Sequence, residues 1–127
     1  HRMGGFTHLF SFFPEKGSLM ESVQSPPIEV YRRIQLARWL IDNDKSSFDE
    51  MTFDHSGKII DFGCIDHQLD EIINTGEPFE TSGCPGFDGR TACNRPYGNE
   101  KPGKDIRNFP FRLEVEDVRK VKHELGR

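Results

Sequence analysis

The chain has 127 residues, enough for one domain of ordinary size, and 34% of them are hydrophobic while 30% are charged. A net charge of −4 gives no general attraction to nucleic acid or to anionic lipid, and no apolar run approaches the length of a membrane-spanning helix. We therefore expect a cytoplasmic protein that binds neither nucleic acid nor membrane. Because apolar residues are few and the first strand begins without a leader, we also expect a piece of a longer protein.

The first predicted element is a strand over residues 6–13, a mostly apolar run that Pro14 and Gly17 end. A helix over residues 28–42 follows, with Ser25 as its expected N-cap and two prolines at its first turn. Helical spacing places one set of residues on its apolar face: Tyr31, Ile34, Ala37, Leu40 and Ile41.

Strand and helix signals then appear again. Residues 48–53 and 59–62 are short strand candidates around a polar turn, and residues 64–74 have helical spacing up to the stop at Gly76. Residues 114–125 form the last predicted helix, with an apolar stripe of Val115, Val118, Val121 and Leu125. Because strands and helices alternate with short connections, we expect an α/β fold with a parallel sheet.

The simplest such architecture is the C-terminal portion of a (β/α) barrel, a partial TIM barrel, in residues 1–80. Residues 81–127 would then form an extended cysteine-containing tail that ends in the last helix. Chemistry in a barrel sits where strands end, which selects the loops 13–18 and 54–57. His55 is a candidate general base in the second loop, although a lone histidine in a turn is more often a surface residue.

Cys84 and Cys93 lie in a segment, residues 83–103, that holds five glycines and three prolines. Such a backbone bends sharply and aims thiols at a common point. Cys64 is a candidate third ligand, and its place at the start of a helix predicts a lowered thiol pKa. Three thiolates suit an iron–sulfur cluster with one open iron, whereas zinc needs a fourth ligand such as His67 or a water.

Other interpretations of the cysteines remain open. Free cysteines are often small buried hydrophobes, and a disulfide between Cys84 and Cys93 is an alternative. An odd cysteine count and the lack of a leader favour a reducing compartment, where thiols ligate or react. Basic and aromatic side chains gather in and after this segment and suggest a site for a carboxylate, a phosphate or a protein partner: Arg90, Arg95, Tyr97, Lys101, Lys104, Arg107, Phe109, Phe111 and Arg112.

Two parts of the chain resemble a known family. The run THLFSFFPEKGSLM (residues 7–20), followed by YRRIQLAR (residues 31–38), looks like the late barrel of biotin-synthase-like radical S-adenosylmethionine enzymes. There, a strand that ends in a Pro-x-x-Gly-Thr-type turn precedes a helix rich in Arg and Ala. The run GEPFETSGCP (residues 76–85), with CNRPY (residues 93–97), is similar to the C-terminal tail of a subgroup that includes archaeal-type lipoyl synthases.

The resemblance implies a radical enzyme that cleaves S-adenosylmethionine and abstracts hydrogen from an unactivated carbon of a small-molecule or acyl-carrier-linked substrate. In sulfur-inserting members an auxiliary cluster is the sulfur donor. By this analogy Cys84 and Cys93, with Cys64, would hold an auxiliary 4Fe–4S cluster. The residues that would border S-adenosylmethionine are Pro14, Gly17 and Ser18.

The chain departs from the family in two ways. The Cys-x-x-x-Cys-x-x-Cys motif of the radical-generating cluster is absent, so we expect an upstream part to carry it. No arginine stands in residues 50–53, where biotin synthases place a cluster ligand, so biotin synthesis itself is not expected. A zinc-stabilised module without catalysis, held by Cys64, His67, Cys84 and Cys93 and docking a partner subunit, is the alternative. A tail that acts as a lid or subunit contact without any metal is a third hypothesis.

Overall fold

A computed structural model describes residues 1–5, 7–81, 83–88, 91–93 and 103–127, with the backbone alone for residues 84–85 and 91–93. The described residues form a small mixed α/β structure with three α-helices, two short 3₁₀ helices and two separate antiparallel strand pairs. In chain order the elements are α1 Ile28–Asp42, η1 Phe48–Glu50, β1 Thr52–Phe53, β2 Ile59–Asp61, α2 Asp66–Thr75, η2 Glu77–Phe79, β3 Cys84–Pro85, β4 Thr91–Cys93 and α3 Val115–Leu125.

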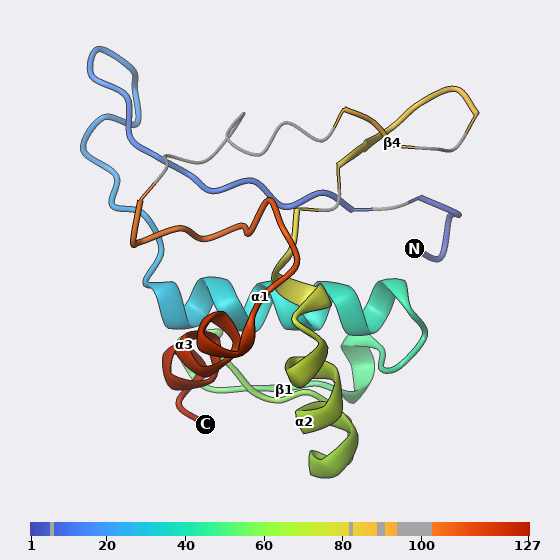
Figure 1. Cartoon of the computed structure of the whole chain (residues 1–127). Coiled ribbons are helices and arrows are strands. Elements are labelled where there is room, and N and C mark those ends of the chain that lie inside the picture. Colours follow the sequence, from blue (N-terminus) through green and yellow to red (C-terminus); the bar gives the residue numbers. More distant parts are fainter. Residues whose placement is uncertain (6, 82, 89–90, 94–102) are drawn as a thin grey trace.

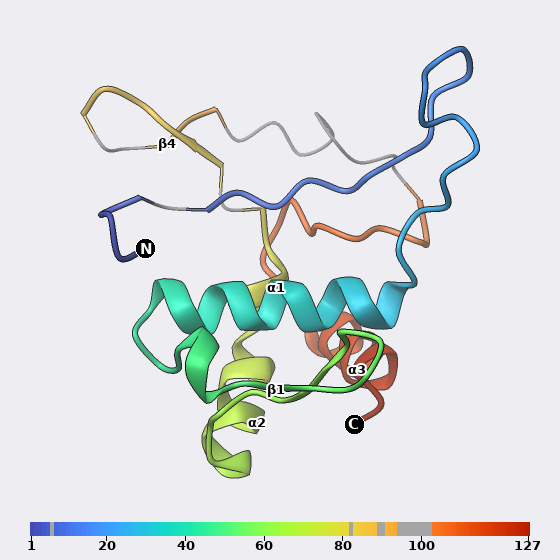
Figure 2. The ribbon, with the colours of Figure 1, turned by 180° about the vertical axis from the view of Figure 1, so that it is seen from behind.

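Helix α1 occupies the middle of the molecule. In Figures 1 and 2, α2, α3 and the β1–β2 pair lie on one side of α1. The extended N-terminal segment, the β3–β4 hairpin and the chain that leads into α3 lie on the other side. Because α1 is covered on both sides, it buries more of its surface than a helix with one apolar face.

The bounds predicted for α1 are confirmed, but its predicted cap is wrong. Pro27 is the N-cap residue, and no side chain caps the helix. The Ser25 hydroxyl instead donates to the carbonyl oxygen of Phe12 at 2.7 Å. This bond ties the start of α1 to the extended N-terminal segment.

The β1–β2 pair is an antiparallel hairpin. Its turn is closed by the Asp54 carboxylate, whose Oδ1 accepts from the backbone N–H and the hydroxyl of Ser56 at 2.8 and 2.7 Å. The Ser56 hydroxyl is the main cause of the lowered pKa of Asp54. Gly57, at φ +84°, completes the turn. A self-contained polar turn therefore joins these strands, where we expected strands of a parallel sheet.

The predicted strand over residues 6–13 is also wrong within the described part. Residues 7–13 run as an extended chain that forms no strand ladder, and Phe10 is 55% exposed. A strand needs a partner strand for its backbone hydrogen bonds, and the two strand pairs of the described residues do not include this segment. The described residues accordingly give no evidence of a partial TIM barrel.

One hydrophobic core holds the elements together, and residues from both predicted domains, 1–80 and 81–127, pack in it. Helix α1 packs against α3 and η2, and α2 packs against η2 and α3. The predicted terminal helix is confirmed as α3, although Val115 of its predicted stripe is 72% exposed. The buried members of the core are Leu36, Ala37, Leu40, Met51, Ile59, Phe62, Leu69, Ile73, Phe79, Ile106, Phe109, Leu113, Val121 and Leu125.

Candidate functional site

The β3–β4 hairpin sets the two cysteines of the tail opposite each other. The strands pair antiparallel, with Cys84 as the Cα partner of Cys93 and Pro85 as the partner of Thr91. Directly opposed residues of an antiparallel pair have Cβ atoms about 4.5–5.5 Å apart. The backbone therefore brings together two candidate ligands that the sequence separates by nine positions.

The chain that carries this hairpin leaves and rejoins the core at one place. We call residues 82–105 the cysteine loop, and residues 79–81 with 106–109 its base. At the base, the backbone N–H of Thr81 donates to the carbonyl oxygen of Phe109 at 2.7 Å, and the N–H of Phe109 donates to that of Phe79 at 3.0 Å. These bonds form a parallel bridge between Glu80 and Phe109. The two segments of the base are thus joined directly to each other.

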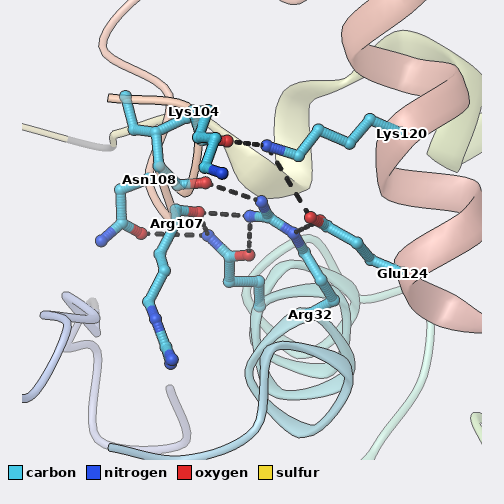
Figure 3. A network of polar contacts seen from close by, with 8 residues as sticks. Arg32, Lys104, Arg107, Asn108, Lys120 and Glu124 are labelled. Carbon is cyan, nitrogen blue, oxygen red and sulfur yellow. Dashed lines mark hydrogen bonds and ion pairs between the residues drawn. The ribbon is translucent and has the colours of Figure 1, made fainter. Parts of the chain in front are cut away.

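Arg32 fills the space beneath the loop base (Figure 3). Its side chain is fully buried, and its guanidinium lies against the rings of Phe79 and Phe109, 5.8 and 5.2 Å from their centroids. It donates to the carbonyl oxygen of Ile106 at 2.9 Å and also to that of Arg107. Arg32 therefore contacts the outgoing and the returning end of the loop at the same time.

A carboxylate on α3 is the counter-ion of Arg32. Its Nε donates to the Glu124 carboxylate at 2.7 Å, and the Glu124 side chain is only 13% exposed. Lys120 lies 3.9 Å from the same carboxylate and also donates to the carbonyl oxygen of Lys104 (Figure 3). A buried guanidinium needs both a counter-ion and hydrogen-bond acceptors, and this arrangement supplies them.

A second set of side chains on α1 holds Asn108 of the returning end. The Gln35 amide donates to the Asn108 Oδ1 and to the Arg107 carbonyl oxygen, both at 3.0 Å. Tyr31 and Asn108 exchange hydrogen bonds of 2.9 and 3.1 Å, and the Asn108 amide also donates to the Ser11 hydroxyl at 3.3 Å. Tyr31, Arg32 and Gln35, at positions i, i+1 and i+4 of α1, thus anchor the loop base.

This polar network was not predicted from the sequence. Tyr31 was expected on an apolar face, and Arg32 and Gln35, which are 0% and 1% exposed, were not among the candidate residues. One signal was present. Gln35 follows Arg32 by three positions and Tyr31 by four, so helical spacing indicated that these side chains are neighbours but not that they are buried.

Cys64 lies apart from the hairpin. It directly precedes α2, and in both views the start of α2 is on the opposite side of α1 from the β3–β4 hairpin (Figures 1 and 2). Its thiol is within hydrogen-bond distance of the carbonyl oxygens of Lys45 and Phe62, at 3.4 and 3.7 Å. Cys64 is partly buried against the core, as expected for a small hydrophobe.

The predicted lowering of the Cys64 thiol pKa is wrong. Burial raises this pKa, and the nearby carboxylates of Glu50 and Asp61 add to the effect, because both disfavour the thiolate. His67, the candidate fourth zinc ligand, is exposed on α2 and lies 3.8 Å from Glu71. The structure therefore does not bring Cys64 and His67 to the cysteine pair.

We predict that native Cys64 reacts slowly with iodoacetamide. Its raised pKa leaves a smaller thiolate fraction at pH 8 than an unhindered cysteine has, and the rate should still be rising above pH 9. The measurement is peptide mass spectrometry of alkylation at Cys64 against pH, with the urea-unfolded chain as control. A native rate equal to the unfolded rate at pH 8 would contradict the prediction.

The predicted S-adenosylmethionine residues lie in an exposed turn. Pro14, Gly17 and Ser18 are all exposed. Gly17, at φ +84°, donates its N–H to the Glu21 carboxylate at 2.6 Å, and the Ser18 hydroxyl donates to the Glu15 carbonyl oxygen at 2.8 Å. The turn and the β3–β4 hairpin lie at opposite ends of the same side of the molecule (Figure 1). The structure does not bring these two predicted sites together.

The structure also locates the other residues singled out from the sequence. His55 is exposed at the tip of the β1–β2 hairpin, beside the self-contained Asp54 turn. Of the basic and aromatic group, Arg107 lies over the Tyr31 ring at 5.3 Å, Phe109 is buried and Phe111 is half exposed. Four members of the group fall outside the described residues: Arg90, Arg95, Tyr97 and Lys101.

Within the described part of the chain, no three His, Cys, Asp or Glu side chains gather into a group that could hold a metal ion. No helix among the described residues is long and apolar enough to cross a membrane. A scan against protein-family models, a search of curated proteins and a search of solved structures found no match for this chain. A functional assignment therefore depends on the residues of this chain and their arrangement.

Proposed function

We propose that this chain is the C-terminal part of a radical S-adenosylmethionine enzyme of the biotin-synthase-like and archaeal lipoyl-synthase-like kind. Its tail would hold an auxiliary 4Fe–4S cluster through Cys84 and Cys93. The observation that carries the proposal is the opposed backbone position of these two cysteines in the β3–β4 hairpin. The sequence resemblance of residues 7–38 and 76–97 supports the same assignment.

The candidate ligands are of the residue type that binds iron–sulfur clusters. Cysteine thiolates are the usual protein ligands of iron–sulfur clusters, and the backbone register here places two cysteine residues opposite each other. Two thiolates do not complete a cluster, and Cys64 lies just before α2, which is on the other side of α1 from the β3–β4 hairpin. Under the proposal Cys64 as a third ligand stays a prediction, and any remaining ligand comes from outside the described residues.

The residues of this chain would hold the auxiliary cluster in place. When bound, the cluster supplies a sulfide for carbon–sulfur bond formation, with the protein providing position and a dry site. The bridge between Glu80 and Phe109 fixes the base of the loop that carries the ligands. Since the chain lacks the Cys-x-x-x-Cys-x-x-Cys motif, radical generation is assigned to an upstream part or a partner subunit.

The same proposal assigns a role to the extended N-terminal segment. Residues 7–13 are extended, and the turn with Pro14, Gly17 and Ser18 follows them. In a partial barrel this segment would pair with upstream strands, and the turn would then border S-adenosylmethionine. The substrate would be a small molecule or an acyl group on a carrier, in the cytoplasm.

The test is anaerobic reconstitution of the full-length protein with iron and sulfide, followed by counting of bound iron. The double variant Cys84→Ala, Cys93→Ala should lose about four irons per chain, the content of one 4Fe–4S cluster. Cys64→Ala is the matched single-thiol control and reports whether that residue is a third ligand. Cleavage of S-adenosylmethionine should persist in the double variant while product formation is lost.

Other outcomes would replace the proposal. Iron content that is unchanged in the double variant would exclude a cluster on this hairpin. Zinc in the unmodified protein, lost in the double variant together with the folded tail, would favour the zinc-stabilised interaction module. A covalent bond between Cys84 and Cys93 in protein kept under reducing conditions would favour a structural disulfide.

A further inference from the structure

The β3–β4 hairpin is short, and its position depends on the segments that connect it to the core. An isolated two-stranded hairpin is marginally stable in water, so β3 and β4 need support from outside their own short ladder. The strand β3 begins only three residues after Thr81, whose N–H donates to the Phe109 carbonyl oxygen at 2.7 Å. The position of Cys84 therefore depends on how firmly the base is held.

One side chain contacts both segments of the base. Arg32 lies against the rings of Phe79 and Phe109 and donates to the carbonyl oxygens of Ile106 and Arg107. Its planar guanidinium offers several donors in a fixed fork, which a lysine ammonium does not reproduce. Arg32 comes from the second turn of α1, so it connects the loop base to the central helix of the fold.

We propose that Arg32 is a positioning residue for the cysteine pair. By fixing the base, residues 79–81 and 106–109, against α1, it would hold the backbone of Cys84, and through the β3–β4 pairing that of Cys93, at a constant place relative to the core. The inference rests on the proposed function for what the cysteines ligate. We call the contacts of Arg32 with the loop base the clamp. The clamp can be tested without any metal, so the positioning role and the proposed function can fail separately.

The neighbouring residue supplies a matched control. Arg33 donates to the carbonyl oxygens of Ile59 and Leu125, at 2.9 and 3.0 Å, and so ties α1 to β2 and to the end of α3. These contacts lie away from the loop base. Arg33→Lys therefore removes the same kind of side chain from the same helix and leaves the clamp in place.

The experiment is hydrogen exchange of the metal-free full chain, compared between Arg32→Lys and Arg33→Lys. In Arg32→Lys the amides of Thr81, Phe109 and the β3–β4 hairpin should exchange faster, by a factor on the order of ten or more, because the base opens locally. The amides of α2 should keep their protection. In Arg33→Lys the loop base and the hairpin should exchange as in the unmodified chain.

A second variant covers the case in which Arg32→Lys does not fold. Asn108→Ala loosens the returning end of the loop without changing Arg32, and it should increase exchange at the same amides. Unchanged exchange at the base in a folded Arg32→Lys protein would overturn the inference. So would an equal increase in Arg33→Lys, or a hairpin with no protection in the unmodified chain.

Counting bound iron tests the proposed function separately. If the unmodified full-length protein binds the auxiliary cluster, Arg32→Lys should also change its absorption or paramagnetic spectrum, whereas Arg33→Lys should not. If the protein binds no cluster but the exchange result holds, the proposed function fails and the clamp stands. A bound cluster whose spectrum is insensitive to Arg32 would overturn the positioning role.

Discussion

Replacing Glu124 by alanine is expected to lower the free energy of unfolding by about 3 kcal/mol, because it removes one partner of a buried ion pair. Arg32 has no solvent exposure, and its Nε donates to Glu124 at 2.7 Å. Without this carboxylate the guanidinium keeps its carbonyl partners but loses its counter-ion. Leaving a buried charge without this counter-ion costs far more free energy than losing an exposed ion pair.

The control is Glu116→Ala on the same helix. Glu116 pairs with Arg119, but their side chains are 78% and 68% exposed. An exposed pair contributes about 0–1 kcal/mol, so this change should be nearly neutral. Urea unfolding of both variants, followed by circular dichroism, gives the two differences. Equal losses in both would mean that the Arg32 network does not support the fold.

The helices were predictable because their signals are local. Two prolines and a long amphipathic run set the bounds of α1, and Gly76 ends α2 in the left-handed conformation that glycine adopts easily. The terminal helix begins after Glu114, whose carboxylate and that of Asp117 form a capping box. Such signals depend on residues within one or two turns, and the sequence contains them in full.

The strands were less predictable because they depend on partners. An apolar run such as residues 7–13 indicates an extended segment, but only tertiary structure decides what it pairs with. Ser11 within this segment is buried, yet it contacts Asn108 of the loop base through a side chain. The two short runs around Asp54 formed a hairpin because the polar turn between them is complete in itself.

The candidate site was predictable in part. A glycine- and proline-rich segment with two cysteines indicated a common point for both thiols, and the backbone register places their positions opposite each other. Cys64 was grouped with them by residue type alone, and its place across α1 could not be known from spacing. Arg32 was missed because arginine is rarely buried, so a helical pattern ordinarily assigns it to solvent.

The second large effect is expected at Gly76, where α2 ends. Its φ is +78°, and a Cβ at this position would lie 2.7 Å from the Cβ of Leu113. Alanine in the left-handed conformation costs about 1–2 kcal/mol, and forcing extra volume into a packed site costs about 1–3 kcal/mol. We therefore expect Gly76→Ala to lower the free energy of unfolding by about 2–5 kcal/mol.

Gly57→Ala separates the two contributions. Gly57 has φ +84°, but no atom lies within 4 Å of its would-be Cβ, so this variant should show the backbone cost alone. The difference between the two variants then measures the close approach of α2 to the chain that leads into α3. Because Gly76 directly precedes the η2 turn that carries Phe79, this approach also sets where the cysteine loop leaves the core. Equal losses at both glycines would show that Leu113 yields without cost.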